Sequence, residues 1–185
     1  ACRQARIWRD ELGAAAPEKV SVNLSARQFS PMLVREIQLV LNETGLGPGG
    51  LKLEITEGVL MRSEASTFAI LQELKELGID LALDDFGVGY SSLAYLKRFP
   101  FSSLKIDRSF VQRIGRDPED AAIIRAIVTI ARTLHMHIVG EGIETVDQYE
   151  HLLSLGCDRG QGYYFARPMP VHAVGELLRT GLQRR

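Results

Sequence analysis

The sequence predicts an α/β fold in which parallel strands alternate with helices and form part of a (β/α)8 barrel. Short apolar runs alternate with helical periodicity along the chain, and the runs are apolar at consecutive positions, as in parallel strands that are covered on both faces. The repeated order of strand, helix and strand implies right-handed parallel crossovers. The candidate strands are Lys19–Asn23, Leu51–Thr56, Asp80–Asp84, Ser103–Asp107, His137–Glu141 and Gly160–Phe165.

Start and stop signals place helices in most of the gaps between these strands. The chain opens on residues that resemble the middle of a helix, and Ser30-Pro31 predicts the N-terminus of a second helix that ends at Gly45. Thr145 and Gln148 form a capping box. The remaining signals are an apolar face at Phe68, Leu71, Leu74 and Leu77 that stops at Gly78, a start at Asp117-Pro118, a stop at Gly156 and a last helix over Val171–Leu182.

Six candidate strands are fewer than the eight of a closed barrel, which usually takes about 250 residues. We therefore expect two further strands ahead of Ala1, so that residues 1–185 form the C-terminal three quarters of a barrel domain. A doubly wound open sheet is the structural alternative, although no glycine-rich phosphate loop follows the first strand.

Composition limits the classes of partner. Of 185 residues, 45% are hydrophobic and 24% charged, and the net charge of −1 offers no basic field for long nucleic acid. A small phosphate ligand would therefore need a local cation. Two cysteines, Cys2 and Cys157, indicate reduced structural thiols, and neither a signal peptide nor a run of roughly 20 apolar residues for a membrane span is present.

Polar side chains stand at the carboxyl ends of nearly all the candidate strands, which in a parallel barrel converge on one face. Taken singly, each acid could be a helix cap or turn residue, and Lys105 could belong to a salt bridge in the core. The pair Asp84-Asp85 is harder to explain in that way, because adjacent buried carboxylates repel each other unless a cation neutralises them. The set is Asn23, Glu54, Asp84, Asp85, Lys105, Asp107, Glu141, Glu144 and Gln161.

Oxygen ligands without clustered His or Cys favour Mg2+ or Mn2+ over Zn2+, and we do not expect His135 and His137 to be ligands. Several carboxylates that hold two hard cations suit phosphodiester cleavage by an activated water.

The motifs resemble those of the EAL domain family, in its order and spacing. They are Val-Asn-Leu-Ser-Ala-Arg-Gln (22–28), Leu-Glu-Ile-Thr-Glu (53–57), Asp-Asp-Phe-Gly-Val-Gly-Tyr-Ser-Ser-Leu (84–93), Leu-Lys-Ile-Asp (104–107), Glu-Gly-Ile-Glu (141–144) and Gln-Gly-Tyr-Tyr-Phe-Ala-Arg-Pro (161–168). The resemblance implies a TIM-like barrel that hydrolyses cyclic di-GMP to linear pGpG with two Mg2+ or Mn2+ ions. It also implies a homodimer and a cytoplasmic bacterial location, and a parent protein attached to the membrane is left open.

The resemblance also implies roles for individual residues. Asn23, Glu54 and Asp84 would bind one metal, and Asp84, Asp85 and Glu141 the other. Lys105 would orient or help deprotonate the water, and Asp85 and Glu141 would share in catalysis. Substrate contacts would come from Gln161, Glu144 and Arg27. A loop that couples metal binding to dimerisation would contain Gly87, Gly89, Ser91 and Ser92, with Glu57 bracing it.

The sequence departs from the family pattern at two points. Val88 stands where Thr or Ala is commoner, and the Glu-Ala-Leu segment, whose Glu should ligate the first metal, does not occur in residues 1–185. We expect that segment upstream in a longer chain, and weak or absent hydrolysis without it. Two other functions therefore stay open. One is a module that binds cyclic di-GMP without cleaving it, and the other is a barrel aldolase that forms a Schiff base on Lys105, although that would leave the paired aspartates without a role.

Overall fold

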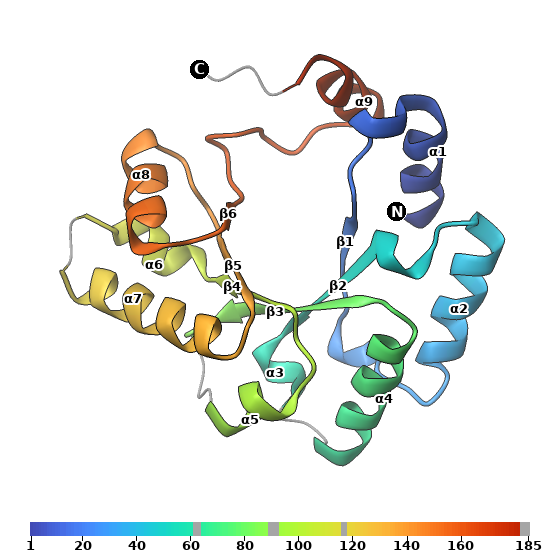
Figure 1. The fold of residues 1–185 in the computed structure, drawn as a ribbon, viewed down its shortest axis with the longest axis horizontal. Helices are drawn as coiled ribbons and strands as arrows, with labels where there is room; N and C mark the ends of the chain where they lie inside the picture. Colours follow the sequence, from blue (N-terminus) through green and yellow to red (C-terminus); the bar gives the residue numbers. More distant parts are fainter. Residues whose placement is uncertain (61–63, 89–92, 116–117, 182–185) are drawn as a thin grey trace.

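Six parallel strands form one sheet that curves into an open half-barrel, with helices on its outer face (Figure 1). This is a computed structural model, and it describes residues 1–60, 64–88, 93–115 and 118–181. The strands pair in the order in which they follow each other along the chain, as the alternation of strands and helices predicted. They are β1 (Val20–Asn23), β2 (Leu51–Thr56), β3 (Asp80–Phe86), β4 (Ser103–Ile106), β5 (His137–Gly140) and β6 (Arg159–Gly160).

The helices follow the strands around the outside of the curved sheet (Figure 1). Within the described ranges, none is both long and apolar enough to span a bilayer. The helix bounds are α1 (Cys2–Leu12), α2 (Leu33–Thr44), α3 (Glu57–Leu60), α4 (Glu64–Glu76), α5 (Leu93–Arg98), α6 (Arg108–Arg113), α7 (Pro118–Thr133), α8 (Val146–Leu155) and α9 (Val171–Thr180).

The hydrophobic core lies between the outer face of the sheet and the helices. Strand side chains alternate between the two faces, so the apolar residues of β2 and β3 pack outward while Glu54 and Asp84 face inward. The outward positions of these strands are almost fully enclosed, and so are Leu71 and Leu74 of the predicted apolar face of α4, whereas Phe68 and Leu77 of that face are only partly buried. Residues of this core with at most 1% exposure include Ile55, Leu71, Leu74, Leu81, Leu83, Leu104, Ile106, Ile124, Ala131 and Ile138. This layer fixes the strands, and hence the direction of the polar side chains at their ends.

Several predicted helix signals are confirmed. The Thr145 hydroxyl accepts a hydrogen bond from the N–H of Gln148, whose side-chain oxygen accepts from the N–H of Thr145, so the capping box of α8 is complete. Gly45 and Gly156 end their helices in the left-handed conformation. Asp117 lies outside the described residues, and Pro118 begins α7.

The predicted start of the second helix is wrong by two residues. The Ser30 hydroxyl accepts from the N–H of Met32 at 3.3 Å, and the Ser30 carbonyl accepts from the N–H of Leu33 at 3.1 Å. Ser30 therefore closes a turn ahead of α2 rather than capping the helix.

The prediction of a last strand over Gly160–Phe165 is also wrong, because only Arg159 and Gly160 pair with β5. A Cβ on Gly162 would lie 2.1 Å from the carbonyl oxygen of Ile143, so the chain turns against that backbone instead of continuing the ladder. The N–H of Tyr164 donates to the same carbonyl at 2.9 Å. Two aromatic residues of the predicted strand pack on Tyr149, whose ring stacks on Tyr164 at 5.6 Å and meets Phe165 edge-on at 5.8 Å.

The segment after β6 crosses to the other edge of the sheet, where α9 lies against α1 (Figure 1). The contact is close, because a Cβ on Gly175 would lie 3.5 Å from Nε1 of Trp8. Arg179 of α9 also forms an ion pair with Glu11 of α1 at 3.6 Å. The two ends of the described chain thus pack together beside β1.

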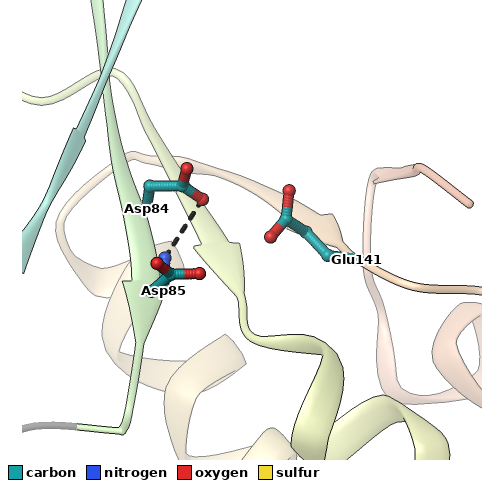
Figure 2. A group of neighbouring side chains, drawn as sticks. All are labelled: Asp84, Asp85 and Glu141. Atoms are coloured by element: carbon teal, nitrogen blue, oxygen red, sulfur yellow. Dashed lines mark hydrogen bonds between the residues drawn. The ribbon is translucent and has the colours of Figure 1, made fainter. Parts of the chain in front are cut away.

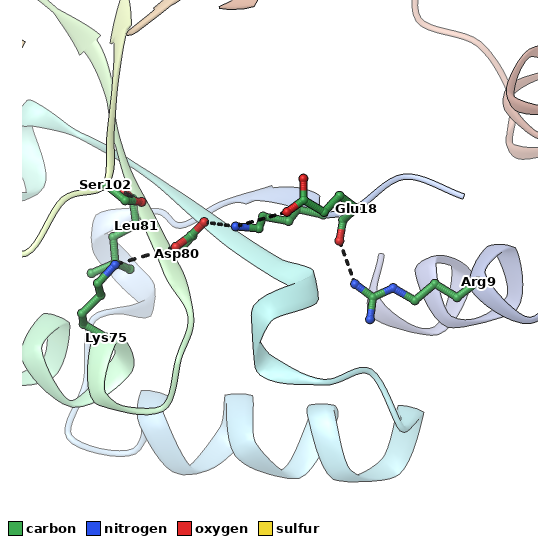
Figure 3. A network of polar contacts seen from close by, with 7 residues as sticks. Arg9, Glu18, Lys75, Asp80, Leu81 and Ser102 are labelled. Atoms are coloured by element: carbon green, nitrogen blue, oxygen red, sulfur yellow. Dashed lines mark hydrogen bonds and ion pairs between the residues drawn. The ribbon is translucent and has the colours of Figure 1, made fainter. Parts of the chain in front are cut away.

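At the amino ends of the strands, a polar network joins β1 to β3 (Figure 3). Asp80, the first residue of β3, forms ion pairs with Lys19 and, at 3.7 Å, with Lys75. Burial and the nearby charge of Arg159 also lower the pKa of Lys52 in β2. Glu18 contributes a further acid to this network, with its Oε1 4.0 Å from Nζ of Lys19.

The contact at Gly162 gives a first prediction. We expect Gly162→Ala to lower the free energy of unfolding by about 2 kcal/mol or more, because the new methyl group would overlap the Ile143 backbone rather than a side chain that can move. Urea denaturation measures this change. Gly49→Ala is the matched control, since its Cβ meets nothing within 4 Å, and it should stay within about 0.5 kcal/mol of the wild type. Equal stability of the two variants would contradict the close packing at Gly162.

Candidate metal and catalytic site

Strand register brings the predicted polar residues to one end of the half-barrel. Asn23 pairs with Glu54 across β1 and β2, and Asp84 lies opposite Thr56 at the end of β2. Glu141 follows β5 directly, and its N–H donates to the carbonyl of Ile106 in β4 at 3.2 Å. These residues lie at the carboxyl ends of β1, β2, β3 and β5, as expected for the carboxyl-end face of a parallel barrel.

Lys105 lies at the centre of this group. Its Nζ is 2.5 Å from Oε2 of Glu54, 2.9 Å from Oδ1 of Asp84 and 2.7 Å from Oε1 of Glu141. The side chain thus links β4 to the ends of β2, β3 and β5. Lys105 is 4% exposed, Asp84 8% and Glu54 9%, so these charges are largely shielded from water. Burial disfavours the ammonium, but the three carboxylates outweigh burial and raise the pKa of Lys105 well above its ordinary value.

Three carboxylates can also approach one ion. One oxygen from each of Asp84, Asp85 and Glu141 lies within 4.8 Å of the others. Figure 2 shows that Asp84 and Asp85 come from β3, while Glu141 extends toward them from beyond the end of β5. We refer to these three residues as the acidic trio. Such a group of hard oxygen ligands fits Mg2+ or Mn2+.

Two adjacent aspartates can share one face because the strand is irregular at Asp85. In a regular strand, consecutive side chains point to opposite faces. Here Asp85 has a φ of 55°, and the pairing of β3 with β4 shifts register between Leu83 and Phe86. Asp is one of the few residues other than Gly that adopt this left-handed conformation readily. The N–H of Asp85 donates to Oδ1 of Asp84 at 3.1 Å, which ties the two residues together.

Two acids of the site, Glu141 and Asp85, lie in surroundings that disfavour their negative charges. Burial raises the pKa of Glu141 even though Lys105 lowers it. Burial raises the pKa of Asp85 as well, with further increases from the charges of Asp84 and Asp107. One ammonium therefore does not neutralise the site, and a divalent cation would relieve the remaining repulsion.

Asp107 supports the site from the start of α6. Its Oδ1 accepts from the N–H of Ser109 at 2.8 Å, which makes it the N-cap of that helix. Burial works against its charge, but hydrogen bonds from Ser109 and Asp85 lower its pKa. The sequence placed Asp107 at a strand end but gave no sign of its contact with Asp85.

A cavity of about 600 Å3 lies beside these side chains. This size is in the usual range for small-molecule sites. Sequence reasoning overlooked Ser25 and Thr56, although both follow or end a strand whose acid or amide it had selected. The polar residues that line the cavity are Asn23, Ser25, Glu54, Thr56, Asp84 and Asp85.

The other predicted site residues are less tightly assembled. Gln161 is exposed, and its backbone is held because its N–H donates to Gly140 at 2.9 Å and its carbonyl accepts from Ile143 at 3.1 Å. Glu144 is exposed, and its N–H donates to the Gln148 side chain. Arg27 is exposed in the short 3-10 turn after β1.

The predicted loop residues are only partly described. Glu57 begins α3, and its Oε2 is buried with no hydrogen-bond partner among the residues that the structure describes. Gly87 has a φ of 102°, and a Cβ there would lie 2.9 Å from the Phe110 ring. The predictions for Gly89, Ser91 and Ser92 fall outside the described residues.

Comparison with known proteins identifies close relatives. Residues 1–168 match the EAL domain family. The bifunctional diguanylate cyclase/cyclic di-GMP phosphodiesterase MucR of Pseudomonas aeruginosa is 48% identical over 175 residues, which are 94% of this chain and 25% of MucR. The cyclic di-GMP phosphodiesterase NbdA of the same organism is 43% identical over 181 residues, which are 97% of this chain and 23% of NbdA. The chain thus spans about a quarter of the length of these relatives.

Solved structures share the fold. The MucR phosphodiesterase in complex with cyclic di-GMP has a TM-score of 0.89 and 46% identity, over 94% of this chain and 70% of that one. The EAL domain of Mycobacterium smegmatis DcpA has a TM-score of 0.92 and 35% identity, over 99% of this chain and 82% of that one. Klebsiella pneumoniae BlrP1 with manganese and cyclic di-GMP has a TM-score of 0.80 and 30% identity, over 89% of this chain and 42% of that one.

The raised pKa of Asp85 gives a second prediction. Because the folded state disfavours the charge, Asp85 contributes stability below the ordinary carboxyl pKa and loses it as the pH rises through the raised value. In EDTA at pH 7.5 we expect Asp85→Asn to stabilise the protein by a few tenths to about 1 kcal/mol, a range reduced for solvent screening. Asn also tolerates the left-handed backbone.

Urea denaturation at several pH values tests this expectation. The gain should vanish near pH 3.5, where the carboxyl group takes up its proton in the unfolded chain as well. Asp147→Asn, in the exposed first turn of α8, is the control and should give no gain at either pH. A loss of stability in Asp85→Asn at pH 7.5 would show that the charge at Asp85 is favourable.

Proposed function

The chain belongs to the EAL domain family, and from this premise we propose that it hydrolyses cyclic di-GMP to linear pGpG with the help of two divalent cations, Mg2+ or Mn2+. The observation that carries the proposal is the meeting of Asn23, Glu54, Asp84, Asp85, Lys105 and Glu141 at one end of the sheet beside a cavity. The relatives support the substrate, since MucR and NbdA are named for action on cyclic di-GMP.

The donor set fits hard cations. Asn23, Glu54 and Asp84 would hold one ion, and the acidic trio would hold the other, with Asp84 common to both. The trio brings one oxygen from each residue within 4.8 Å of the others, and burial together with the neighbouring acids raises the pKa of Glu141 and of Asp85. The related BlrP1 was solved with manganese, which supports the same class of ion here. When bound, such ions supply a more acidic water and neutralise phosphate charge.

The residues of the chain would do the remaining work. Lys105 enters the site from β4 and brings a positive charge, with which it would orient the attacking water and the phosphodiester. The cavity beside Asn23 and Glu54 would receive the nucleotide. Gln161, Glu144 and Arg27 are exposed at the same end of the sheet and would contact the parts of the substrate away from the reacting phosphate.

The ion pairs of Lys105 argue against the aldolase hypothesis. A Schiff-base lysine must lose its proton to attack a carbonyl. Here three carboxylates hold Lys105 as an ammonium and raise its pKa. Its environment therefore favours an electrostatic role.

The third prediction concerns turnover. With Mg2+ or Mn2+, the purified protein that includes the expected upstream Glu-Ala-Leu segment should convert cyclic di-GMP to pGpG, as resolved by anion-exchange chromatography, and EDTA should stop the reaction. Asp84→Asn should lower kcat by about a thousandfold or more, because Asp84 is the ligand that both ions would share. Asp147→Asn, an acid of the same type outside the site, should keep the wild-type rate.

Two outcomes would contradict the proposal in different ways. Tight calorimetric binding of cyclic di-GMP with the ligand unchanged after hours would indicate a binding module. A folded protein that neither binds nor cleaves cyclic di-GMP would show that cyclic di-GMP is not its substrate.

A further inference from the structure

We propose that Lys105 is the built-in counter-ion of the metal-free site, and that a divalent cation must displace its ammonium from Asp84 and Glu141 in order to bind. The inference rests on the proposed function only in taking the acidic trio as a cation site. It adds an exchange of one cation for another, in which Lys105 opposes metal binding and also stabilises the site before metal arrives.

The ammonium of Lys105 and a divalent cation would need the same residues. Lys105 Nζ is 2.9 Å from Oδ1 of Asp84 and 2.7 Å from Oε1 of Glu141, and both residues belong to the trio. An ion coordinated at a normal distance by either oxygen would lie within about 5 Å of the ammonium. Two positive charges at that separation, shielded from water, repel each other strongly.

The Lys105 side chain has little freedom to move away from Asp84 and Glu141. Its residue is 4% exposed, and its backbone is fixed in β4 between β3 and β5. Only the end of the side chain can move. The directions open to it are toward Glu54, where Nζ is already 2.5 Å from Oε2, and toward the cavity that Glu54 lines.

Lys105 also matters in the protein without metal. Glu54 and Asp84 lie in β2 and β3 and Glu141 directly follows β5, and without a cation their charges would force the strand ends apart. Lys105 supplies that cation from a fourth strand. The site therefore assembles before metal binds, and the ammonium reduces the affinity of the assembled site for metal.

Lys105 would therefore have opposite effects on the stability of the metal-free protein and on its affinity for a divalent cation. A general structural role would not produce opposite effects. Removing the Lys105 charge should make the metal-free protein less stable and yet make it bind a divalent cation more tightly. A side chain that only packs would lower both stability and affinity when it is truncated.

The experiment compares the wild type with Lys105→Met, which keeps most of the apolar stem and removes the charge. Mn2+ is titrated into EDTA-dialysed protein in a calorimeter, without nucleotide. We expect the Kd for Mn2+ to be at least tenfold lower in Lys105→Met. The metal-free unfolding midpoint should fall by several degrees and recover with saturating Mn2+.

Two control variants sharpen the comparison. Lys105→Arg keeps the charge and should show no gain in affinity, and Lys97→Met removes an exposed lysine of α5 and should match the wild type in both measurements. Equal or weaker Mn2+ binding by Lys105→Met would overturn the inference while leaving the proposed function intact. If neither the wild type nor the variant binds Mn2+, both proposals fail.

A measurement on the wild type alone covers the case in which Lys105→Met does not fold. The ammonium of a buried, triply paired lysine exchanges its protons slowly enough for an 15N–1H lysine NMR spectrum. We expect one such resonance in EDTA, absent from Lys105→Arg, and its shift or loss on titration with diamagnetic Mg2+. A resonance that stays unchanged while Mg2+ saturates the site would overturn the displacement.

Discussion

The structure of the site depends on one buried positive charge. Without the Lys105 ammonium, Glu54, Asp84 and Glu141 would be carboxylates held close together in a region largely shielded from water, and removing one partner of such a group usually costs several kcal/mol. The three acids sit on different strands, so the ion pairs also fix the spacing of the strand ends. The Lys105 ammonium that makes this arrangement possible also contacts the carboxylate oxygens that another cation would need.

The acidic trio depends on a second constraint, the irregular backbone at Asp85. The regular alternation of β3 places Leu81 and Leu83 in the outer core and Asp84 inside, and by that rule Asp85 would point outward. The left-handed φ and the shift in register return its carboxylate to the side of Asp84. The backbone thus holds the two carboxylates side by side in spite of their repulsion. A residue other than glycine in the left-handed region is the kind of local strain that is found at functional sites.

The sequence predicted most of the fold because its signals were local or followed from parallel pairing. The consecutive apolar residues of β2 to β5 and the capping box at Thr145 needed no tertiary information. The convergence of Asn23, Glu54, Asp84 and Glu141 followed from the rule that parallel strands end on one face. The sequence could not predict the end of β6, because the chain turns where Gly162 meets the distant backbone of Ile143. The sequence also left two roles open for Lys105, a salt bridge in the core and a catalytic role. The structure shows a buried, ion-paired lysine whose partners are themselves candidate site residues.

The two ends of the sheet distribute charge in opposite ways. At the amino ends, Asp80 has two cationic partners, Lys19 and Lys75, and Lys52 and Arg159 lie near enough to influence each other. At the carboxyl ends, Lys105 forms ion pairs with Glu54, Asp84 and Glu141, and Asp85 adds a fourth acid beside them. A net charge of −1 for the whole chain conceals this separation. The local excess of negative charge lies at the end that also has the cavity, where it would attract a divalent cation.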